Sequence, residues 1–218
     1  MRSIAMLGGT GQQGRGLAQR FAAAGMRVIV GSRDPDRARN AVAAWGETRE
    51  SIAVADNLAA VTQSTVVVLA VPFPTVDALL SEVHDRLQDG ATVIDVTVPV
   101  TFAGGKMTMF DVAEGSAAEH VRARLPQHVH VAGTFMTIPA HLLGDVRASL
   151  DCDEFVCADS EEARAQASAL IDLLPGLRPV NVGPLARARH VEHLTALAIA
   201  INRRHKIHDA RFRVVGLP

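Results

Sequence analysis

The sequence predicts an α/β protein with a Rossmann-type doubly wound parallel sheet and a small C-terminal α+β domain. Short β-branched runs alternate with helical patterns through the first half of the chain. A glycine-rich turn, GGTGQQG, separates the first strand from the first helix. After Pro99 the regular alternation ends. We therefore expect a dinucleotide-binding domain over residues 1–130 and a smaller domain over residues 131–218.

The first half contains four predicted strands, at residues 3–7, 26–30, 66–71 and 91–96. The third is apolar at every position, which is typical of a strand covered on both faces. A helix follows each of the first three strands. The first helix ends at Gly25, the second begins at Asp34 and Pro35, and the third runs from residue 76 to 87 before Gly90. Repeated units of this kind predict a parallel sheet.

The second half is less regular. Residues 107–110 are expected to be irregular, and Ser116 with Glu119 predicts a capping box for a helix reaching residue 125. Strands are expected at 128–135, 155–158 and 178–182. Between the last two, Asp159 with Glu162 is expected to cap a helix that reaches residue 174.

The last predicted helix, from about residue 186 to 204, contains the apolar segment LTALAIAI. Such a segment leaves little polar surface for water. We expect it to join two copies of the chain in a homodimer. The alternative is a helix wholly buried within one chain.

Composition excludes several classes of partner. The chain of 218 residues has a net charge of -1, so it has no basic excess to attract nucleic acid or an anionic membrane. Its start does not resemble a signal peptide, and the longest apolar run is too short to span a bilayer. The two cysteines, Cys152 and Cys157, fit a reducing compartment. We expect a cytoplasmic protein whose partners are small molecules.

Gly9, Gly11 and Gly14 form a G-x-G-x-x-G pattern directly between a strand and a helix. In that context the glycines allow a tight turn, close approach of the backbone to a pyrophosphate, and close packing of helix on sheet. The start of the helix supplies free N–H groups and the positive end of its dipole. The pattern predicts a dinucleotide site.

The end of the second strand indicates which dinucleotide binds. NAD sites carry an acidic residue there to accept the ribose 2'-hydroxyl, whereas this chain continues with Gly31, Ser32 and Arg33. Ser32, Arg33 and Arg37 can bind a 2'-phosphate through charge-assisted hydrogen bonds. The sequence therefore favours NADP.

Several reductase classes are disfavoured because the residues that they need are missing. Short-chain dehydrogenases use a Tyr-x-x-x-Lys pair, and this chain has no tyrosine. Two-domain hydroxyacid dehydrogenases use a lysine near the substrate and a large helical domain. The only lysines of this chain are Lys106 and Lys206, and its length leaves no room for such a domain. His190 and His193 do not form an H-E-x-x-H pattern, and no metal site is expected. Asp95, at a strand end, is expected to serve in a turn.

The chain resembles the NADPH-dependent coenzyme F420 reductases, also called F420H2:NADP oxidoreductases, over nearly its whole length. The resemblance rests on MLGGTGQQGRGLAQRFAAAGMRVIVGSR, VPV at residues 98–100, TIPA at 137–140, and GLRPVNVGPLARARHVEHLTALAIAIN from residue 176. It implies hydride exchange between NADP(H) and the deazaflavin F420, with the small C-terminal domain closing over the deazaflavin. Direct transfer between two stacked rings needs no catalytic side-chain acid or base.

The resemblance also implies where the coenzymes bind. Thr10, Gln12 and Gln13 would lie at the pyrophosphate turn, and Ala70, Val71 and Pro72 near the NADP ribose and nicotinamide. The deazaflavin pocket would be lined by Val98, Pro99, Met136, Ile138, Pro139 and Ala140.

Met136 departs from the family pattern, because a member of that family carries histidine at the position just before TIPA. A thioether cannot donate a hydrogen bond to a ring carbonyl, although it packs well against an aromatic face. Backbone N–H groups of the same loop are expected to meet the ring oxygens instead. Two alternatives remain open: an NADPH-dependent reductase of a flavin, metal complex or imine, and a non-catalytic NADPH-binding regulator.

Overall fold

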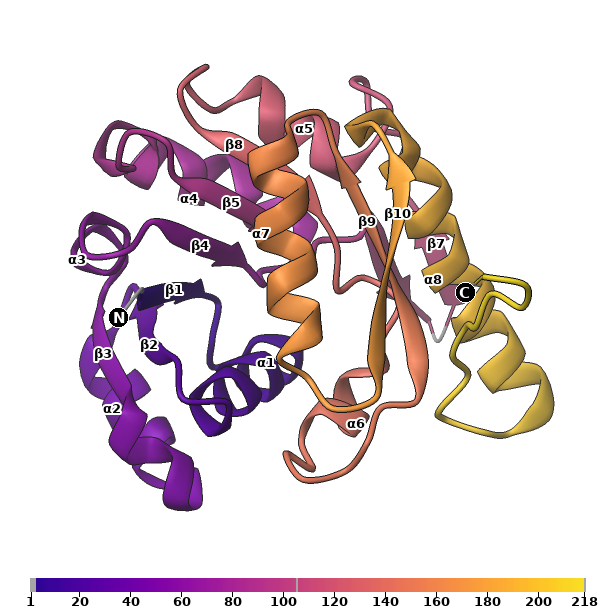
Figure 1. Ribbon diagram of the computed structural model, residues 1–218, viewed down its shortest axis with the longest axis horizontal. Helices are drawn as coiled ribbons and strands as arrows, with labels where there is room; N and C mark the ends of the chain where they lie inside the picture. Colours follow the sequence, from indigo (N-terminus) through magenta and orange to yellow (C-terminus); the bar gives the residue numbers. More distant parts are fainter. Residues whose placement is uncertain (1–2, 105, 218) are drawn as a thin grey trace.

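The computed structural model describes residues 3–104 and 106–217 and forms one eight-stranded sheet with helices on both faces (Figure 1). The strands are β1 (Ser3–Leu7), β2 (Arg27–Ser32), β3 (Ile52–Asp56), β4 (Val66–Leu69), β5 (Thr92–Asp95), β8 (His130–Gly133), β9 (Cys152–Ala158) and β10 (Leu177–Gly183). The helices are α1 (Gln12–Ala23), α2 (Pro35–Ala43), α3 (Asn57–Thr62), α4 (Val76–Val83), α5 (Ala117–Ala123), α6 (Ala140–Leu143), α7 (Glu161–Asp172) and α8 (Ala188–His205).

The strand order is β10-β9-β8-β5-β4-β1-β2-β3. From β8 to β3 every neighbouring pair is parallel, whereas β9 runs antiparallel to β8 and β10 runs parallel to β9. The chain winds outward in both directions from the β1–β4 pair, which is the place where a Rossmann sheet opens a crevice at its carboxyl edge. The predicted Rossmann-type fold class is confirmed.

The predicted division at residue 130 coincides with the start of β8. The strands beyond it do not begin a new sheet, because β8 pairs with β5 and β9 pairs with β8. A two-stranded hairpin, β6 (Val100–Ala103) and β7 (Lys106–Met109), lies outside the main sheet. The expectation of irregular structure at residues 107–110 was therefore wrong.

Two further local predictions need correction. The segment that forms β3 and α3 was not predicted, because the edge strand IAVAD has no clear alternation of polar and apolar residues. Helix α7 is capped by Ser160, whose hydroxyl accepts the Ala163 N–H at 3.1 Å, and not by Asp159. The Asp159 carboxylate instead accepts the Leu185 N–H at 2.9 Å.

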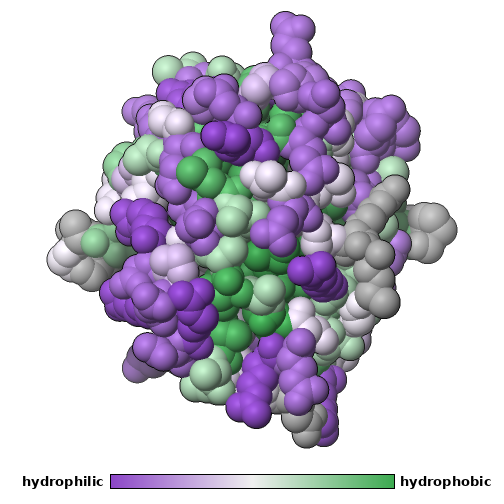
Figure 2. All heavy atoms as spheres, turned by 90° about the vertical axis from the view of Figure 1, so that its left-hand side faces the viewer, coloured by the Kyte–Doolittle hydropathy of each residue, from purple (hydrophilic) through white to green (hydrophobic). Residues whose placement is uncertain are grey.

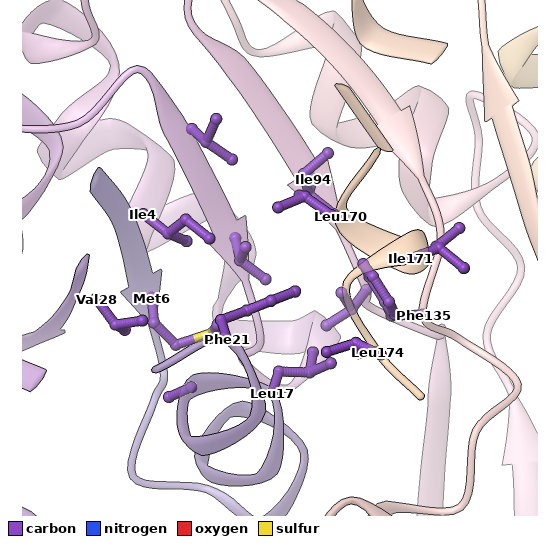
Figure 3. Close-up of a cluster of buried hydrophobic side chains, with 14 of the residues drawn as sticks. Ile4, Met6, Leu17, Phe21, Val28, Ile94, Phe135, Leu170, Ile171 and Leu174 are labelled. Atoms are coloured by element: carbon purple, nitrogen blue, oxygen red, sulfur yellow. The ribbon is translucent and has the colours of Figure 1, made fainter. Parts of the chain in front are cut away.

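Two apolar clusters fill the space on the two faces of the sheet. On one face, α1, α6 and α7 cover the strands, and Phe21 meets Phe135 edge-on with ring centroids 5.9 Å apart (Figure 3). On the other face, α3, α4, α5 and α8 cover the strands. Both faces are buried, and this explains why β4 is apolar throughout.

The surface is mixed in character. Figure 2 shows the side of the molecule that lies on the left in Figure 1, where apolar residues form a band between polar ones. Within residues 3–104 and 106–217, no helix is long and apolar enough to cross a membrane.

Candidate functional site

The predicted binding residues converge on the carboxyl edge of the sheet. Strands β1, β4, β5 and β8 are aligned so that their last residues lie side by side, with Leu7 opposite Leu69, Leu69 opposite Asp95, and Asp95 opposite Gly133. The four segments that follow them are the glycine loop at 8–11 and the segments at 70–72, 97–99 and 134–140. Residues separated by more than a hundred positions are thereby brought to one edge.

The glycines of the loop have different roles. A Cβ on Gly14 would lie 2.5 Å from the Gly8 carbonyl oxygen, and a Cβ on Gly8, where φ is +80°, would lie 2.4 Å from the Ala70 carbonyl oxygen. These two glycines are required by the fold itself. A Cβ on Gly11 would meet only the Gly8 carbonyl oxygen, at 3.4 Å, which is ordinary contact. Gly11 therefore leaves an open side that fits close approach by a pyrophosphate.

Helix α1 begins at this open side without a side-chain cap. Its N-cap residue is Gly11, and the first turn holds no acidic residue. Side chains cap α2, α3, α5 and α7, namely Asp34, Asp56, Ser116 and Ser160, whereas α4, α6 and α8 have no side-chain cap, as in α1. The N–H groups of the first turn of α1 are therefore available to an anion, and the residues present fit a dinucleotide phosphate.

The residues after β2 fit the expected 2'-phosphate site in part. The Ser32 hydroxyl accepts the Asp34 N–H at 3.1 Å and donates to the Asp34 carbonyl at 3.0 Å, so it is engaged within its own turn. The Asp34 carboxylate accepts the Arg37 N–H at 3.0 Å as the cap of α2. Arg33 and Arg37 are exposed, and neither side chain contacts a hydrogen-bond or ion-pair partner within the described part of the chain.

Gln13, which the resemblance places at the pyrophosphate turn, makes a long-range contact with its side chain. Its side-chain amide donates to the Phe135 carbonyl at 2.7 Å and so points toward the segment after β8. Thr10 and Gln12 are exposed at the loop. The glycine loop and the start of α1 are consequently connected to the expected deazaflavin loop by a side-chain hydrogen bond.

The expected nicotinamide and deazaflavin segments are only partly open. In the segments after β4 and β5, Pro72 is exposed and three residues are half-buried, namely Ala70, Val71 and Val98. Pro99 is buried, and its carbonyl accepts the Phe110 N–H at 2.6 Å. In the segment after β8, Pro139 and Ala140 are half-buried and Ile138 is buried.

Met136 is buried among the apolar side chains on the α8 side of the sheet. Its backbone N–H donates to the Glu154 carboxylate at 3.0 Å. Because Glu154 already accepts this hydrogen bond, any N–H group of the loop that meets a ring oxygen would have to belong to another residue. The packing of the thioether in an apolar environment matches its lack of a donor.

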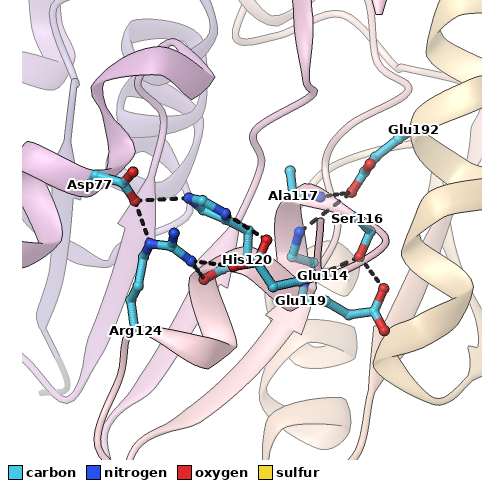
Figure 4. Close-up of polar contacts among 9 residues, drawn as sticks. Asp77, Glu114, Ser116, Ala117, Glu119, His120, Arg124 and Glu192 are labelled. Carbon is cyan, nitrogen blue, oxygen red and sulfur yellow. Dashed lines mark hydrogen bonds and ion pairs between the residues drawn. The ribbon is translucent and has the colours of Figure 1, made fainter. Parts of the chain in front are cut away.

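Buried carboxyl groups lie behind this edge. Asp95 accepts the Thr97 N–H at 3.1 Å, so its expected turn role is confirmed, and burial raises its pKa to about 7. Its second oxygen and the hydroxyls of Thr97 and Thr134 are buried with no partner among the described residues. Glu192 of α8 accepts the Ala117 N–H at 2.9 Å, and burial raises its pKa to about 8 (Figure 4).

A network of charged side chains ties α4 to α5 near the segment after β4 (Figure 4). His120 contacts Asp77 at 2.8 Å through Nε2 and Glu114 at 3.0 Å through Nδ1. Arg124 binds both carboxylates, and its hydrogen bond, together with that of His120, lowers the Glu114 pKa to about 2. The His120 ring also packs on Phe73, with centroids 5.1 Å apart. The segment that follows β4 is thereby held against α5.

Sequence reasoning missed Arg20 and Glu154, and it included Thr195 in the family motif without giving it a role. Arg20 donates to the carbonyls of four residues in the segment after Ala140, namely Leu142, Leu143, Asp145 and Ala148. The signal for Glu154 was an acidic residue inside a strand, but the strand was predicted to begin one residue later.

Within the described residues, no group of three potential metal ligands is found.

Comparison with known proteins agrees with this geometry. A family model described as coenzyme F420-dependent NADP oxidoreductase matches residues 3–99. The chain is 39% identical to the F420-dependent NADP reductase of Methanothermobacter thermautotrophicus, over 99% of this chain and 95% of the relative. It is 31% identical to the F420-dependent NADP reductase of Methanocaldococcus jannaschii, over 98% of each.

Solved structures extend the comparison. A protein from Arthrobacter sp. FB24, described as an F420-dependent NADP reductase, matches with a TM-score of 0.84 at 25% identity, over 99% of this chain and 100% of that chain. An imine reductase from Myxococcus stipitatus matches at 0.61 and 18% identity, over 94% of this chain and 67% of that chain, which shows likeness of fold alone. Because the curated relatives match over nearly the whole of both chains, the protein belongs to the F420-dependent NADP reductase family.

Proposed function

We propose that the protein transfers a hydride between NADP(H) and the deazaflavin coenzyme F420 at the carboxyl edge of the sheet. The observation that carries the proposal is the open side of Gly11 beside the uncapped start of α1, in a chain of this family. When bound, the two coenzymes supply the hydride and its acceptor. The protein would hold the rings about 3–3.5 Å apart with their orbitals aligned.

Preference for NADP over NAD rests on Arg33 and Arg37. Both guanidinium groups are exposed beside the end of β2. The two acidic groups between them each have a partner, since Asp34 accepts the Arg37 N–H and Asp36 pairs with Arg39 at 2.6 Å. A 2'-phosphate would therefore meet two guanidinium groups that can bind it through charge-assisted hydrogen bonds. Thr10, Gln12 and the first-turn N–H groups of α1 would hold the pyrophosphate.

The deazaflavin would lie against the segments at 98–99 and 138–140. Pro139 and Ala140 offer the more exposed surface of the second segment, while Met136 would support the ring from below through apolar packing. Residues after 130 would cover the coenzymes from the β8 side of the sheet. The alternative of a flavin as hydride acceptor requires the same positioning, so it is tested in parallel.

A homodimer through α8 belongs to the proposal. Leu197 of this helix is 49% exposed and Ile201 is only half-buried, so the helix is not wholly buried within one chain. Phe102 on the β6–β7 hairpin is 64% exposed. Light scattering at micromolar concentration tests the dimer, and a monomer there would contradict it.

Action in the cytoplasm is supported by two buried cysteines that form no disulfide.

The decisive experiment is an anaerobic spectrophotometric assay. Purified protein is mixed with NADPH and oxidised F420, and loss of the visible absorption of the deazaflavin is followed. FMN and FAD, a cyclic imine and NADH are tested under the same conditions. Reduction of F420 by NADPH supports the proposal. Reduction of flavin or imine without reduction of F420 selects the alternative reductase, and NADPH binding without any turnover selects the non-catalytic regulator.

A further inference from the structure

The residues that directly follow β8 have an unusual backbone. Phe135 has a φ of +58°, which is unfavourable for a residue with a side chain. Its ring is fully buried between α1 and α7 (Figure 3). A conformation of this kind persists only when the surroundings determine it strongly. We call residues 135–137 the turn, and its position is set by side chains from three other elements.

Glu154 of β9 holds the turn from below. Its carboxylate is completely buried, and one oxygen accepts the Met136 N–H at 3.0 Å while the other accepts the Thr137 hydroxyl at 2.8 Å. Burying a carboxylate is costly unless hydrogen bonds satisfy it. The turn supplies those hydrogen bonds, so carboxylate and turn stabilise each other.

Two further side chains hold the carbonyl oxygens of the same turn. Gln13 of α1 donates to the Phe135 carbonyl at 2.7 Å, and Thr195 of α8 donates to the Met136 carbonyl at 2.9 Å. Gln13 follows directly after the glycine loop, whereas Thr195 lies on a helix of the last part of the chain. The turn is therefore tied at once to the expected NADP loop, to the sheet and to α8.

Building on the proposed hydride transfer, we infer that Gln13, Glu154 and Thr195 form a clamp that fixes the distance between the nicotinamide and deazaflavin rings. The glycine loop would hold one coenzyme, and the residues after the turn would hold the other. The hydrogen bond from Gln13 to Phe135 connects the two supports directly. The three residues are positioning residues, because they bind backbone and Thr137 and not the reacting atoms.

Positioning at this accuracy has a large effect on rate. Hydride transfer needs reacting atoms at near-contact distance, and a displacement of about 1 Å costs about 10²-fold in rate. One lost hydrogen bond raises the population of an open turn by about tenfold. We therefore expect removal of one clamp contact to speed amide exchange in the turn by about tenfold. On the scale given above, a displacement of about 0.5 Å of the residues that follow the turn would slow hydride transfer by about tenfold, while NADPH affinity should change by less than about twofold.

The test compares Thr195→Val, which removes the hydroxyl at nearly constant volume, with Thr195→Ser, which keeps it. Glu154→Gln is the second variant, since it retains one acceptor oxygen. Amide hydrogen exchange of residues 134–140 is measured in the protein without coenzymes, together with the melting temperature and NADPH affinity by calorimetry. Single-turnover hydride transfer is measured by stopped flow.

In Thr195→Val we expect faster amide exchange in residues 134–140 and slower hydride transfer than in the parent protein. In Thr195→Ser we expect the parent values of both. NADPH affinity should be unchanged in both variants. Unchanged exchange in Thr195→Val, or equal defects in the valine and serine variants, overturns the clamp. If the parent protein does not reduce F420, the proposed function fails. The exchange measurement still decides whether the side chains hold the turn, because it needs no coenzyme.

Discussion

Replacing Gly11 with alanine should weaken NADPH binding strongly without unfolding the protein. The backbone at Gly11 has φ -72° and ψ 164°, which alanine adopts readily, and the new Cβ would meet only the Gly8 carbonyl oxygen at 3.4 Å. The reduced freedom of the unfolded chain contributes about 0.4–1 kcal/mol of stability, and the poorer cap costs a similar amount. The unfolding free energy should therefore change by less than about 1 kcal/mol.

The loss in affinity follows from the same geometry. The methyl group would occupy the open side that a pyrophosphate needs, and two hydrogen bonds from backbone N–H groups to phosphate oxygens would be lost. At about 1.5–3 kcal/mol each, their loss weakens binding by about 10²-fold or more. Isothermal titration with NADPH measures the affinity, and urea unfolding without nucleotide measures the stability.

Gly14→Ala is the matched comparison. Its Cβ would lie 2.5 Å from the Gly8 carbonyl oxygen and 2.9 Å from the Gly9 Cα, so backbone must move and stability and affinity should both fall. Gly11→Ala with NADPH affinity within about threefold of the parent would refute the assignment of the open side to pyrophosphate. A stability loss as large as that of Gly14→Ala would refute the reasoning from the Cβ position.

Three other perturbations test separate parts of the structure. The double change Arg33→Ala with Arg37→Ala should weaken NADPH binding by about 10²-fold and leave NADH binding unchanged, as measured by calorimetry, because only NADPH carries the 2'-phosphate. Arg20→Met should lower the unfolding free energy by about 3 kcal/mol or more in urea, since the side chain binds four backbone carbonyls. Raising the pH from 5 to 8 should lower the unfolding free energy, and Asp95→Asn should reduce that slope. Burial raises the pKa of three carboxyl groups, that of Asp95 to about 7, so the folded protein keeps protons that the unfolded chain releases above about pH 4.

Each of these has a control and an opposing outcome. Equal losses of NADPH and NADH affinity would mean that the arginine pair supports the fold. The control Arg39→Met, which removes an exposed ion pair with Asp36, should lower the unfolding free energy by less than about 1 kcal/mol. If Arg20→Met lowered the unfolding free energy by no more than this control, the structural role of Arg20 would be contradicted. An unfolding free energy that rises steadily from pH 5 to 8 would contradict the raised pKa values.

The nucleotide half was predictable because its signals are local. The GGTGQQG turn, the Asp34 cap of α2 and the apolar run at β4 each lie within one short segment of sequence. The β6–β7 hairpin also had a local signal, since Gly104 lies between two β-rich runs, and φ at Gly104 is +54°. The hairpin interrupts the alternation of strand and helix, and this hides its local signal.

The connections between segments were not predictable from local signals. Gln13 and Phe135 are 122 positions apart, and nothing near either residue specifies their hydrogen bond. Glu154 could be recognised as an acidic residue next to an apolar strand, but its partners follow from the antiparallel pairing of β9 with β8. The resemblance to the family pointed to the α8 motif, and the structure supplies the contacts that its residues make.

That motif indicates how the protein contributes to its reaction. Arg189 donates to the Gly115 carbonyl, Glu192 accepts the Ala117 N–H, and Thr195 donates to the Met136 carbonyl. These three side chains of α8 thus bind the backbone of loops or of a helix start rather than projecting toward a reacting atom. A reaction between two coenzymes requires accurate placement more than it requires a catalytic side chain. Selection on such an enzyme would therefore act on residues that hold loops in place, and this explains why the specific part of the family pattern lies on a helix remote in sequence from the glycine loop.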